Sequence, residues 1–394
     1  MRRIAVVTTS RADWGIYRPL LAAIAADPEL ELRLVVAGMH LAPEFGQTAR
    51  DIAAEGWEIA ATVECLLSSD TGQGAAMSLG LAVMGYGQAL TRIAPDLLVV
   101  LGDRFEMFAA AAAAAPLRLP VAHLYGGELT LGAMDDAFRH AITKLSHLHF
   151  VATADYARRV VQMGEEPWRV TLCGALSLDN LARMTLPTRD ELERELGLCL
   201  EPAPLLVTYH PETLSPQDPA DQMAEVLAAL AEFRRPCVFT LPNADPGGRG
   251  LAAMVQEFCA ANPWAQVRDN LGSRRYFGLM RQAAAMVGNS SSGIIEAPSL
   301  GLPVVNVGGR QAGRTRGANV IDAACRRDEI AAGIERACRL GWKEALAGLP
   351  NPYDRGGAAA IILAGLKSAP PAPELLRKEF IDCPIRGHDG EQRG

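Results

Sequence analysis

Short apolar runs alternate with longer helical patterns along the chain, and this alternation restricts the fold more than any other feature. In the first half, almost continuously apolar runs occupy residues 3–9, 32–38, 96–103, 120–126 and 147–153. Such runs are typical of parallel strands that are buried on both faces. Helical composition or spacing separates them at residues 17–28, 105–119 and 135–146. This order predicts βαβ units in an α/β fold with a doubly wound parallel sheet.

A second set of strand patterns predicts a second domain of the same class. After a polar, proline-containing segment near residue 190, apolar runs return at residues 204–211, 236–243, 284–290 and 303–308. A chain of 394 residues also exceeds the size of one ordinary core. We expect Rossmann-like domains at residues 1–188 and 189–367 that face a cleft. Residues 368–394 are expected to form a C-terminal helix and tail with a disordered end.

Composition and charge exclude several classes of partner. No apolar run reaches the ~18–20 residues that a membrane span needs, and no secretory signal follows the basic N-terminus, so we expect a cytoplasmic protein without a membrane partner. A net charge of −7 argues against nucleic acid. Eight cysteines without a C-x-x-C pair argue against a disulfide framework or a zinc ribbon.

Cofactor motifs are not found in the sequence. The nearest match to G-x-G-x-x-G contains Gly85 and Gly87 but lies in a helical pattern, with Leu90 in place of the third glycine. No Walker A loop is found. His147 and His149 alternate along a strand, which indicates packing more often than a metal site. We therefore expect neither a cofactor nor a metal.

Acidic residues follow the predicted strands of the first domain, where ligands bind in open parallel sheets. Asp103 directly follows one strand, and Glu128 follows the next strand after Gly126 and Gly127. Asp135 and Asp136 come next, and together these acids can provide general acid and base groups. Acids in the first turn of a helix explain Asp135 and Asp136 almost as well. Which of the two aspartates acts stays open.

Arg11 and Asp13 follow the first predicted strand. The arginine can reach an anionic ligand in the cleft, whereas helix capping alone explains Asp13 equally well. Arg139 lies further along the helix that begins near Asp135.

In the second domain, the stretch GNSSSG follows a predicted strand and precedes a predicted helix. Hydroxyl groups and unpaired amides at a helix start favour a phosphate or diphosphate. This predicts binding by Ser290, Ser291, Ser292 and Gly293, with Glu296 one turn later accepting from a ribose hydroxyl pair. A serine nucleophile is the competing interpretation, but the G-x-S-x-G pattern is not met.

Basic residues of the second domain complete the expected anion site. Arg310, Arg314 and Arg316 can balance the charge of a diphosphate, and His210 follows the first strand of this domain, at the cleft. A diphosphate site on one domain opposite carboxylates on the other describes an enzyme that acts on a nucleotide sugar.

Several of these stretches, in order along the chain, resemble the UDP-N-acetylglucosamine 2-epimerase family. The resemblance is carried by TTSRADWGIYRPLL, GMHLAPEFG, LGDRFEMFAAA, GGELTLGAMDDAFRHAITKLSHLHFVAT, GNSSSGIIEAPSLGLPVVNVGGRQAGR and GANVID. It extends from about residue 4 to 322, and plausibly to 365. It implies two domains like those of GT-B glycosyltransferases, with neither metal nor nicotinamide.

The resemblance also implies roles for individual residues. Asp103, Glu128 and Asp135 would be the catalytic acids and bases, with His210 assisting from the other domain. Substrate or nucleotide binding would fall to Arg11, Asp13, His40, Arg139, Ser290, Ser291, Ser292, Gly293, Glu296 and Arg316, and residues 270–280 would lie near the base.

The residues found in two of the motifs imply the hydrolysing branch of the family. This chain has GGELTLGAMDD and HPET where non-hydrolysing members have stretches like EAGLRTGD and HRREN. The branch eliminates the nucleotide diphosphate to give a 2-acetamidoglycal and then adds water. The implied substrate is UDP-N-acetylglucosamine, giving N-acetylmannosamine for sialic-type acids. Alternatives are UDP- or GDP-linked 2,4-diacetamido-2,4,6-trideoxyglucose or GDP-N-acetylglucosamine on the way to legionaminic acid.

Three questions stay open on the sequence. A GT-B glycosyltransferase and a non-catalytic nucleotide-sugar sensor are the other functions weighed, although a sensor has no need of Asp103 and Glu128. The family resemblance suggests a homodimer or homotetramer. An allosteric feedback site cannot be recognised from these residues.

Overall fold

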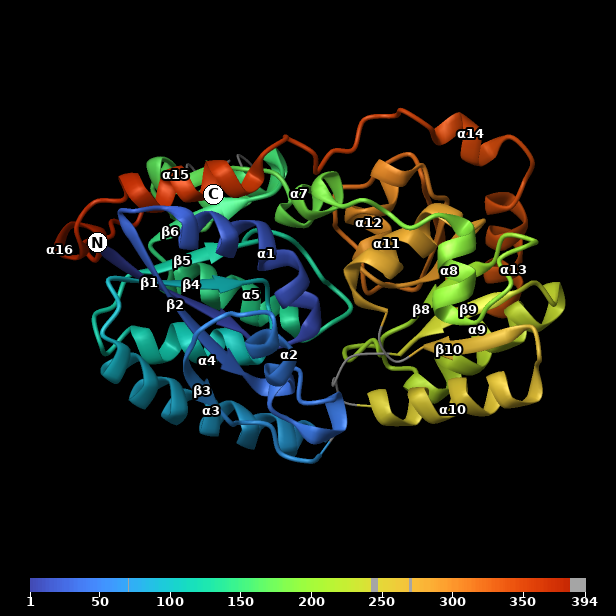
Figure 1. Cartoon of the computed structure of the whole chain (residues 1–394), viewed down its shortest axis with the longest axis horizontal. Coiled ribbons are helices and arrows are strands. Elements are labelled where there is room, and N and C mark those ends of the chain that lie inside the picture. The colour runs from blue at the N-terminus through green and yellow to red at the C-terminus, as the bar shows by residue number, and fades with distance from the viewer. Residues whose placement is uncertain (70, 242–246, 269–270, 383–394) are drawn as a thin grey trace, which may run out of the picture.

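Two α/β lobes lie side by side in the computed structural model, which describes residues 1–69, 71–241, 247–268 and 271–382 (Figure 1). Each lobe is built on one parallel sheet. The expected class of two Rossmann-like domains is confirmed. No helix in the described part of the chain is long and apolar enough to cross a membrane.

The first sheet has seven parallel strands in the order β3-β2-β1-β4-β5-β6-β7. Their bounds are β1 Arg2–Thr8, β2 Leu30–Ala37, β3 Ile59–Val63, β4 Leu97–Leu101, β5 Val121–Leu124, β6 Leu148–Val151 and β7 Val170–Leu172. The strand order reverses between β1 and β4, where Val6 pairs with Val99. This reversal is the topological switch point at which α/β sheets bind ligands.

The second sheet has six parallel strands in the order β10-β9-β8-β11-β12-β13. Their bounds are β8 Leu205–Thr208, β9 Cys237–Thr240, β10 Ala265–Arg268, β11 Ala285–Gly288, β12 Val304–Val307 and β13 Val320–Ala323. Here the order reverses between β8 and β11, where Thr208 pairs with Gly288. The segments holding His210 and the three serines therefore leave neighbouring strands.

Helices cover both faces of each sheet. On the first, α1 (Arg11–Ala26) and α7 (Leu176–Arg183) pack on one face, and α3 (Gly72–Ile93), α4 (Phe105–Ala114) and α5 (Asp135–Leu145) on the other (Figure 1). The shorter α2 (Ala49–Ala54) and α6 (Ala154–Gln162) complete this lobe. The glycines of the rejected G-x-G-x-x-G match lie inside α3, which confirms that this stretch is helical.

In the second lobe, α9 (Pro219–Phe233), α10 (Gly248–Ala261) and α13 (Arg327–Ala337) cover one face. The other face packs against α8 (Arg189–Leu196), α11 (Gly272–Gln282) and α12 (Ser292–Ile295). Because both faces are covered, every residue of the central strands β8, β11 and β12 is buried, and each face has its own apolar core.

The end of the chain returns to the first lobe (Figure 1). After α14 (Trp342–Leu346), helix α15 (Ala358–Ser368) packs against α1 and α7, and Ile362 and Leu366 belong to the first-lobe core. The boundary expected at residue 367 therefore needs correction, because α15 buries its apolar side on the first domain. A helix after residue 368 is found only as α16 (Ala372–Leu375). The expected disorder concerns residues 383–394, which lie outside the described residues.

Candidate active site

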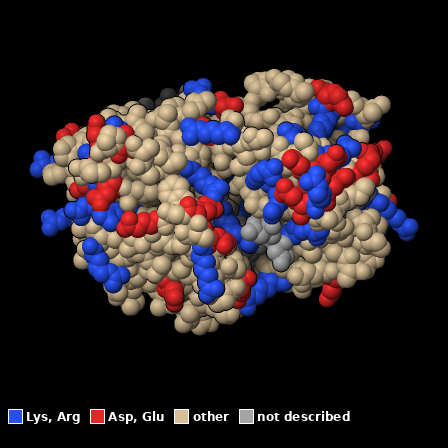
Figure 2. Space-filling view, viewed as in Figure 1, with Lys and Arg blue, Asp and Glu red and all other residues tan. Residues whose placement is uncertain are grey.

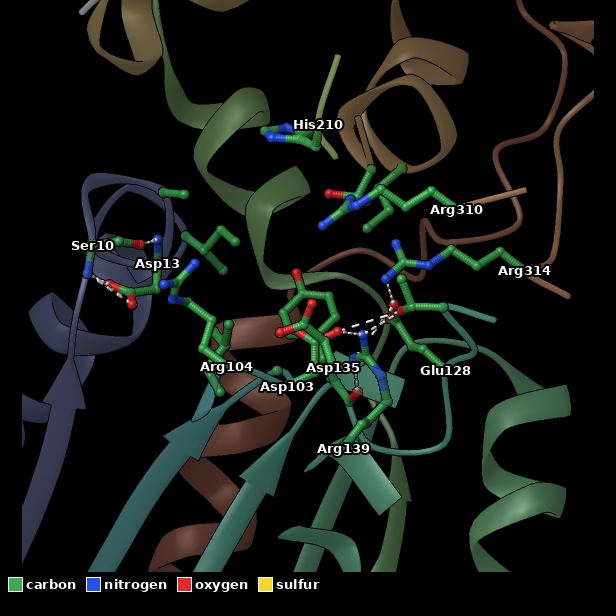
Figure 3. A pocket seen from close by; sticks show the side chains of 18 residues that line it. Ser10, Asp13, Asp103, Arg104, Glu128, Asp135, Arg139, His210, Arg310 and Arg314 are labelled. Carbon is green, nitrogen blue, oxygen red and sulfur yellow. Dashed lines mark hydrogen bonds and ion pairs between the residues drawn. The ribbon is translucent and has the colours of Figure 1, made fainter. Parts of the chain in front are cut away.

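The two switch points face each other across one cavity that both domains line. Ten of its side chains are labelled in Figure 3: Ser10, Asp13, Asp103, Arg104, Glu128, Asp135 and Arg139 come from the first domain, and His210, Arg310 and Arg314 from the second. In the space-filling view, basic and acidic side chains gather along the depression between the two lobes (Figure 2). The cavity therefore combines charges of both signs.

Asp103 lies just after β4 and is paired with a buried cation. The Arg139 guanidinium, only 2% exposed, contacts Asp103 and donates hydrogen bonds to the Thr130 hydroxyl at 3.0 Å and the Tyr125 carbonyl at 2.9 Å. Burial raises the pKa of Asp103, but the charges of Arg139 and Arg314 outweigh burial and leave this pKa below its ordinary value. Asp103 is therefore a charged carboxylate at neutral pH.

Glu128 is the most deeply buried acid of the cavity. It is 1% exposed, and its Oε2 lies 2.9 Å from Nη2 of Arg314, which comes from the other domain. Its Oε1 accepts no hydrogen bond from the residues that the structure describes. Gly127 precedes it with φ of +75°, and a Cβ there would lie 2.5 Å from the Tyr156 carbonyl oxygen. Only glycine fits at this position, because the Gly127 backbone packs closely against the Tyr156 backbone.

The structure separates the two neighbouring aspartates. Asp135, the first residue of α5, lines the cavity and is 7% exposed. Asp136 turns to its own loop, where its Oδ1 accepts a hydrogen bond from the Thr130 amide at 2.6 Å, and its Oδ2 lies 3.5 Å from His140 Nε2. Of this pair, Asp135 is therefore the one placed to meet a ligand.

Asp13 lines the cavity but is committed to local structure. It closes a capping box with Ser10 at the start of α1 and accepts hydrogen bonds from the Thr9 amide and hydroxyl at 2.9 and 2.7 Å. Burial raises the pKa of Asp13, whereas hydrogen bonds with His40, Thr8 and Thr9 lower it to below its usual value. The capping interpretation of Asp13 is confirmed, and a binding role stays a prediction.

His40 and Arg11 are not among the side chains that line this cavity. His40 has no exposed surface, and its two ring nitrogens lie 2.9 Å from the Thr8 hydroxyl and 2.7 Å from the Thr48 hydroxyl. Its Nε2 also lies 3.8 Å from Asp13 Oδ1, so His40 contacts the carboxylate of Asp13 inside the first domain. Arg11, the first residue of α1, is partly exposed.

On the second domain, His210 enters the cavity from the segment after β8 (Figure 3). Asn289 holds the backbone of this histidine on both sides, because its Oδ1 accepts from the His210 amide at 2.7 Å and its Nδ2 donates to the His210 carbonyl at 2.9 Å. Asn289 immediately precedes the three serines, so one side chain connects the histidine segment to the serine turn.

The serine turn follows β11 as expected, but the helix after it is shorter than the sequence predicts. α12 ends at Ile295 and a 3-10 turn continues over Ala297–Leu300, because Pro298 has no amide hydrogen to continue the helix. Ser291 lines the cavity; Ser290 and Ser292 are partly exposed, and Gly293 is buried. Of the three serines at the start of this single helical turn, Ser291 is therefore the one that lines the cavity, and binding by Ser290, Ser292 and Gly293 stays a prediction.

Glu296 ends this turn and is 6% exposed. Burial raises the pKa of Glu296 to about 7, although hydrogen bonds with the Ser177 and Ser292 hydroxyls oppose the shift. Its carboxyl group therefore changes charge near neutral pH.

The three arginines of the second domain have different surroundings. Arg310 and Arg314 line the cavity. Arg316 does not line it; its guanidinium contacts Asp322 and donates to the Gln311 carbonyl at 3.1 Å. Of the three arginines in this loop, Arg310 and Arg314 therefore line the cavity and Arg316 does not, and their binding of a diphosphate stays a prediction.

Sequence reasoning gave no role to Arg104 and Tyr125, which also line the cavity. Arg104 forms a two-fold ion pair with Glu106, at 3.1 Å for each contact, and Glu106 has no exposed surface. Tyr125 has φ of +64°, which is unusual for a residue with a side chain. Their positions at the ends of β4 and β5 were the signal available in the sequence.

Within the described part of the chain, no cluster of three or more His, Cys, Asp or Glu side chains could hold a metal ion. His149 instead lies 3.0 Å from Glu165, and both side chains are fully buried.

Known proteins resemble this chain over most of its length. Residues 22–367 match the family model described as UDP-N-acetylglucosamine 2-epimerase. The chain is 40% identical over 324 residues to the hydrolysing GDP/UDP-N,N'-diacetylbacillosamine 2-epimerase of Campylobacter jejuni, covering 82% of this chain and 84% of that protein. It is 35% identical over 347 residues to a UDP-N-acetylglucosamine 2-epimerase of Neisseria meningitidis, covering 88% and 90%.

A solved structure has the same fold. The crystal structure of UDP-GlcNAc 2-epimerase from Neisseria meningitidis bound to UDP-GlcNAc superposes with a TM-score of 0.78, covering 94% of this chain and 100% of that chain. The two sequences are 17% identical, so this likeness concerns the fold alone.

Proposed function

This chain belongs to the UDP-N-acetylglucosamine 2-epimerase family, and from that premise we propose that it is a hydrolysing nucleotide-sugar 2-epimerase. Its proposed substrate is UDP-N-acetylglucosamine, and its products are N-acetylmannosamine and UDP. The proposed reaction needs proton transfer at the sugar and binding of a diphosphate, and the cavity offers groups for both.

The proposed reaction has two balanced steps. A carboxylate removes the proton from C2, the electrons of the C2–H bond form a C1=C2 double bond, and the C1–O bond breaks with its electron pair leaving on UDP. Water then adds to the 2-acetamidoglycal, its oxygen bonding to C1, while C2 receives a proton on the opposite face. One water is consumed, and the configuration at C2 is inverted.

We assign the proton transfers to Asp103, Glu128 and Asp135, which line one wall of the cavity. His210 and Arg310 on the opposite wall would meet the departing diphosphate, where an imidazolium or guanidinium offsets the charge that develops on the leaving group. Ser290–Ser292 and Gly293 would bind the diphosphate, and Glu296 the ribose hydroxyls.

One observation carries the proposal: Glu128 is buried beside Arg314 and keeps one carboxylate oxygen without a partner among the described residues. A buried oxygen of this kind is costly unless a ligand uses it, and a substrate proton is such a use.

Proton NMR of the protein with UDP-N-acetylglucosamine in deuterated water tests the function. We expect UDP and free N-acetylmannosamine that carries deuterium at C2, because both new C2–H and C1–OH groups come from solvent. Incubation without an acceptor also excludes a glycosyltransferase, which would not release an epimerised free sugar steadily. No turnover despite saturable UDP binding would contradict this substrate.

A second substrate is favoured by one relative. The Campylobacter jejuni protein, at 40% identity, is named for GDP- or UDP-linked N,N'-diacetylbacillosamine. The same two steps apply to a 2,4-diacetamido-2,4,6-trideoxy sugar, since only the C4 and C6 groups differ. A ratio of kcat/KM that favours this sugar over UDP-N-acetylglucosamine would transfer the assignment to it.

A further inference from the structure

We propose that Arg314 is a positioning residue that holds Glu128 in an ion pair and orients it from the opposite domain, so that proton transfer depends on this contact between the two domains. The proposal rests on the proposed function, because it takes Glu128 to exchange a proton with the sugar. It concerns how the second domain takes part in chemistry at the first.

Arg314 contacts the segment of Glu128 and Leu129 through two nitrogen atoms. Its Nη2 lies 2.9 Å from Glu128 Oε2, and its Nε donates a hydrogen bond to the carbonyl of Leu129 at 3.1 Å. Arg314 is 9% exposed and Glu128 1%. A guanidinium that holds both a carboxylate and the adjacent backbone fixes the rotamer of Glu128, and its remaining oxygen, Oε1, is left for the sugar.

The loop that carries Arg314 is held rigidly before the arginine. Glu212 accepts a hydrogen bond from the Gly309 amide at 2.9 Å, and the Gln311 side chain donates to the Asn289 carbonyl at 2.7 Å. These contacts connect the loop to the segments of His210 and the serine turn.

A pair of tyrosines hydrogen-bonds to the backbone of Thr315, the residue that follows Arg314. The Thr315 amide donates to the Tyr156 hydroxyl at 3.1 Å, Tyr353 donates to the Thr315 carbonyl at 2.8 Å, and the two hydroxyls lie 2.6 Å apart. Tyr156 belongs to α6 of the first domain. The position of Arg314 is therefore determined by protein contacts and not by a bound ligand.

Glycines let the two loops approach. Gly313 has φ of +81°, and a Cβ there would lie 2.6 Å from Leu129 Cδ1. On the facing loop, a Cβ at Gly132 would lie 2.8 Å from the Arg310 Cα. Any larger residue at either glycine would therefore push the two loops apart.

Among the described residues, Arg314 is the nearer of the two cations that pair with Glu128. Arg139 Nη1 lies 3.9 Å from Glu128 Oε2, but this guanidinium already serves Asp103, Thr130 and the Tyr125 carbonyl. A buried carboxylate without a paired cation is neutralised by a proton instead of remaining charged. A protonated Glu128 could not accept a proton from the substrate.

The test compares Arg314→Gln with Arg327→Gln, a matched change of an exposed ion-paired arginine remote from the cavity. For Arg314→Gln we expect kcat/KM near pH 7 to fall about 100-fold or more, with the acidic limb of the pH–rate profile displaced by at least about one unit to higher pH. UDP affinity by calorimetry should change less than about threefold. Arg327→Gln should change none of these.

Conservative replacement and chemical rescue separate positioning from folding. Arg314→Lys should recover part of the rate, because it restores a charge but not the bond to the Leu129 carbonyl, and added guanidinium should recover part of the rate of a truncated Arg314→Ala. An Arg314→Gln variant with the wild-type pH profile would overturn the proposal. A variant that loses UDP affinity in proportion to turnover would also overturn it, and would make Arg314 a diphosphate-binding residue.

Infrared difference spectra keep this test independent of turnover. At neutral pH, Arg314→Gln should show a protonated-carboxyl band in addition to the Glu296 signal that wild type already gives, and the double variant Arg314→Gln/Glu128→Gln should lack this additional band. If wild type converts no substrate but this band is found, the proposed function fails and the ion-pair proposal stands. The reverse result, turnover without the band, overturns the ion-pair proposal alone.

Discussion

Glu128 and Glu296 are both buried carboxyl groups beside the same cleft, but their neighbours differ. Glu128 of the first domain faces a guanidinium at 2.9 Å, whereas Glu296 of the second domain has the hydroxyl groups of Ser177 and Ser292 as its hydrogen-bonding partners. For Glu296, burial prevails and raises the pKa to about 7. A buried acid whose hydrogen-bonding partners are neutral hydroxyl groups can thus keep a raised pKa.

This difference suits two different tasks. In the proposed mechanism a proton-transfer group at the sugar has to start charged, and we propose that the ion pair with Arg314 serves this need at Glu128. A group that only accepts hydrogen bonds from ribose hydroxyls can remain neutral in the empty protein and ionise when a ligand supplies donors. The predictions below test this contrast.

The largest effect is expected for Glu128→Gln. The amide keeps the size of the side chain but cannot accept the proton, so turnover should fall about 10³-fold or more. UDP binding should be retained, because the residues that we propose to bind the diphosphate lie on the other domain. Single-turnover kinetics and calorimetry measure the two effects, and an active variant would remove Glu128 from the mechanism.

Gly313→Ala tests the close approach that brings Arg314 to Glu128. The added methyl group meets Leu129, and a displacement of about 1 Å at the site can cost up to about 100-fold in rate. The control is Gly348→Ala, which has φ of +77° but open space around its Cβ. The control should lose only about 1–2 kcal/mol of stability from the backbone. Equal rate losses in both variants would contradict the prediction.

Glu296 should make UDP binding depend on pH. With its pKa raised to about 7, the carboxyl group is neutral below that pH and charged above it, so UDP affinity should rise as pH increases through 7. We expect about a tenfold change between pH 6 and 8, measured by calorimetry. Glu296→Gln should flatten this rise, and an unchanged slope in the variant would assign it to the phosphate groups.

The same raised pKa affects the stability of the ligand-free protein. Because the folded state favours the neutral acid, its contribution is fully present below the unfolded pKa near 4.5 and is lost as pH rises through about 7. Urea unfolding of wild type and Glu296→Gln measures the difference in stability, which should change with pH only between about 4.5 and 7.

The smallest effect is expected for Arg316→Gln. Its guanidinium is engaged by Asp322 and the Gln311 carbonyl, so UDP affinity should change by less than about threefold. Calorimetry with UDP measures it. A loss greater than tenfold would place Arg316 on the diphosphate, as its position in the sequence suggested.

Much of the fold could be predicted because burial on both faces leaves a continuous apolar pattern in every central strand. The candidate acids could be predicted for a related reason: residues that directly follow parallel strands reach the ligand edge of the sheet, as Asp103 and Glu128 do. The return of α15 to the first domain could not be predicted, because an apolar helical pattern does not indicate which of two cores the helix packs on.

Sequence periodicity alone therefore determined two parallel sheets and which residues stand at their carboxyl ends, since strand burial and strand direction are local properties of the chain. Only the tertiary structure selected Asp135 over Asp136 for the cavity and turned Arg316 toward Asp322. It also brought Arg314 to Glu128, 186 residues earlier in the chain. Whether a side chain meets a ligand, a loop or a partner from the other domain depends on how the two sheets face each other, and no local pattern encodes that orientation.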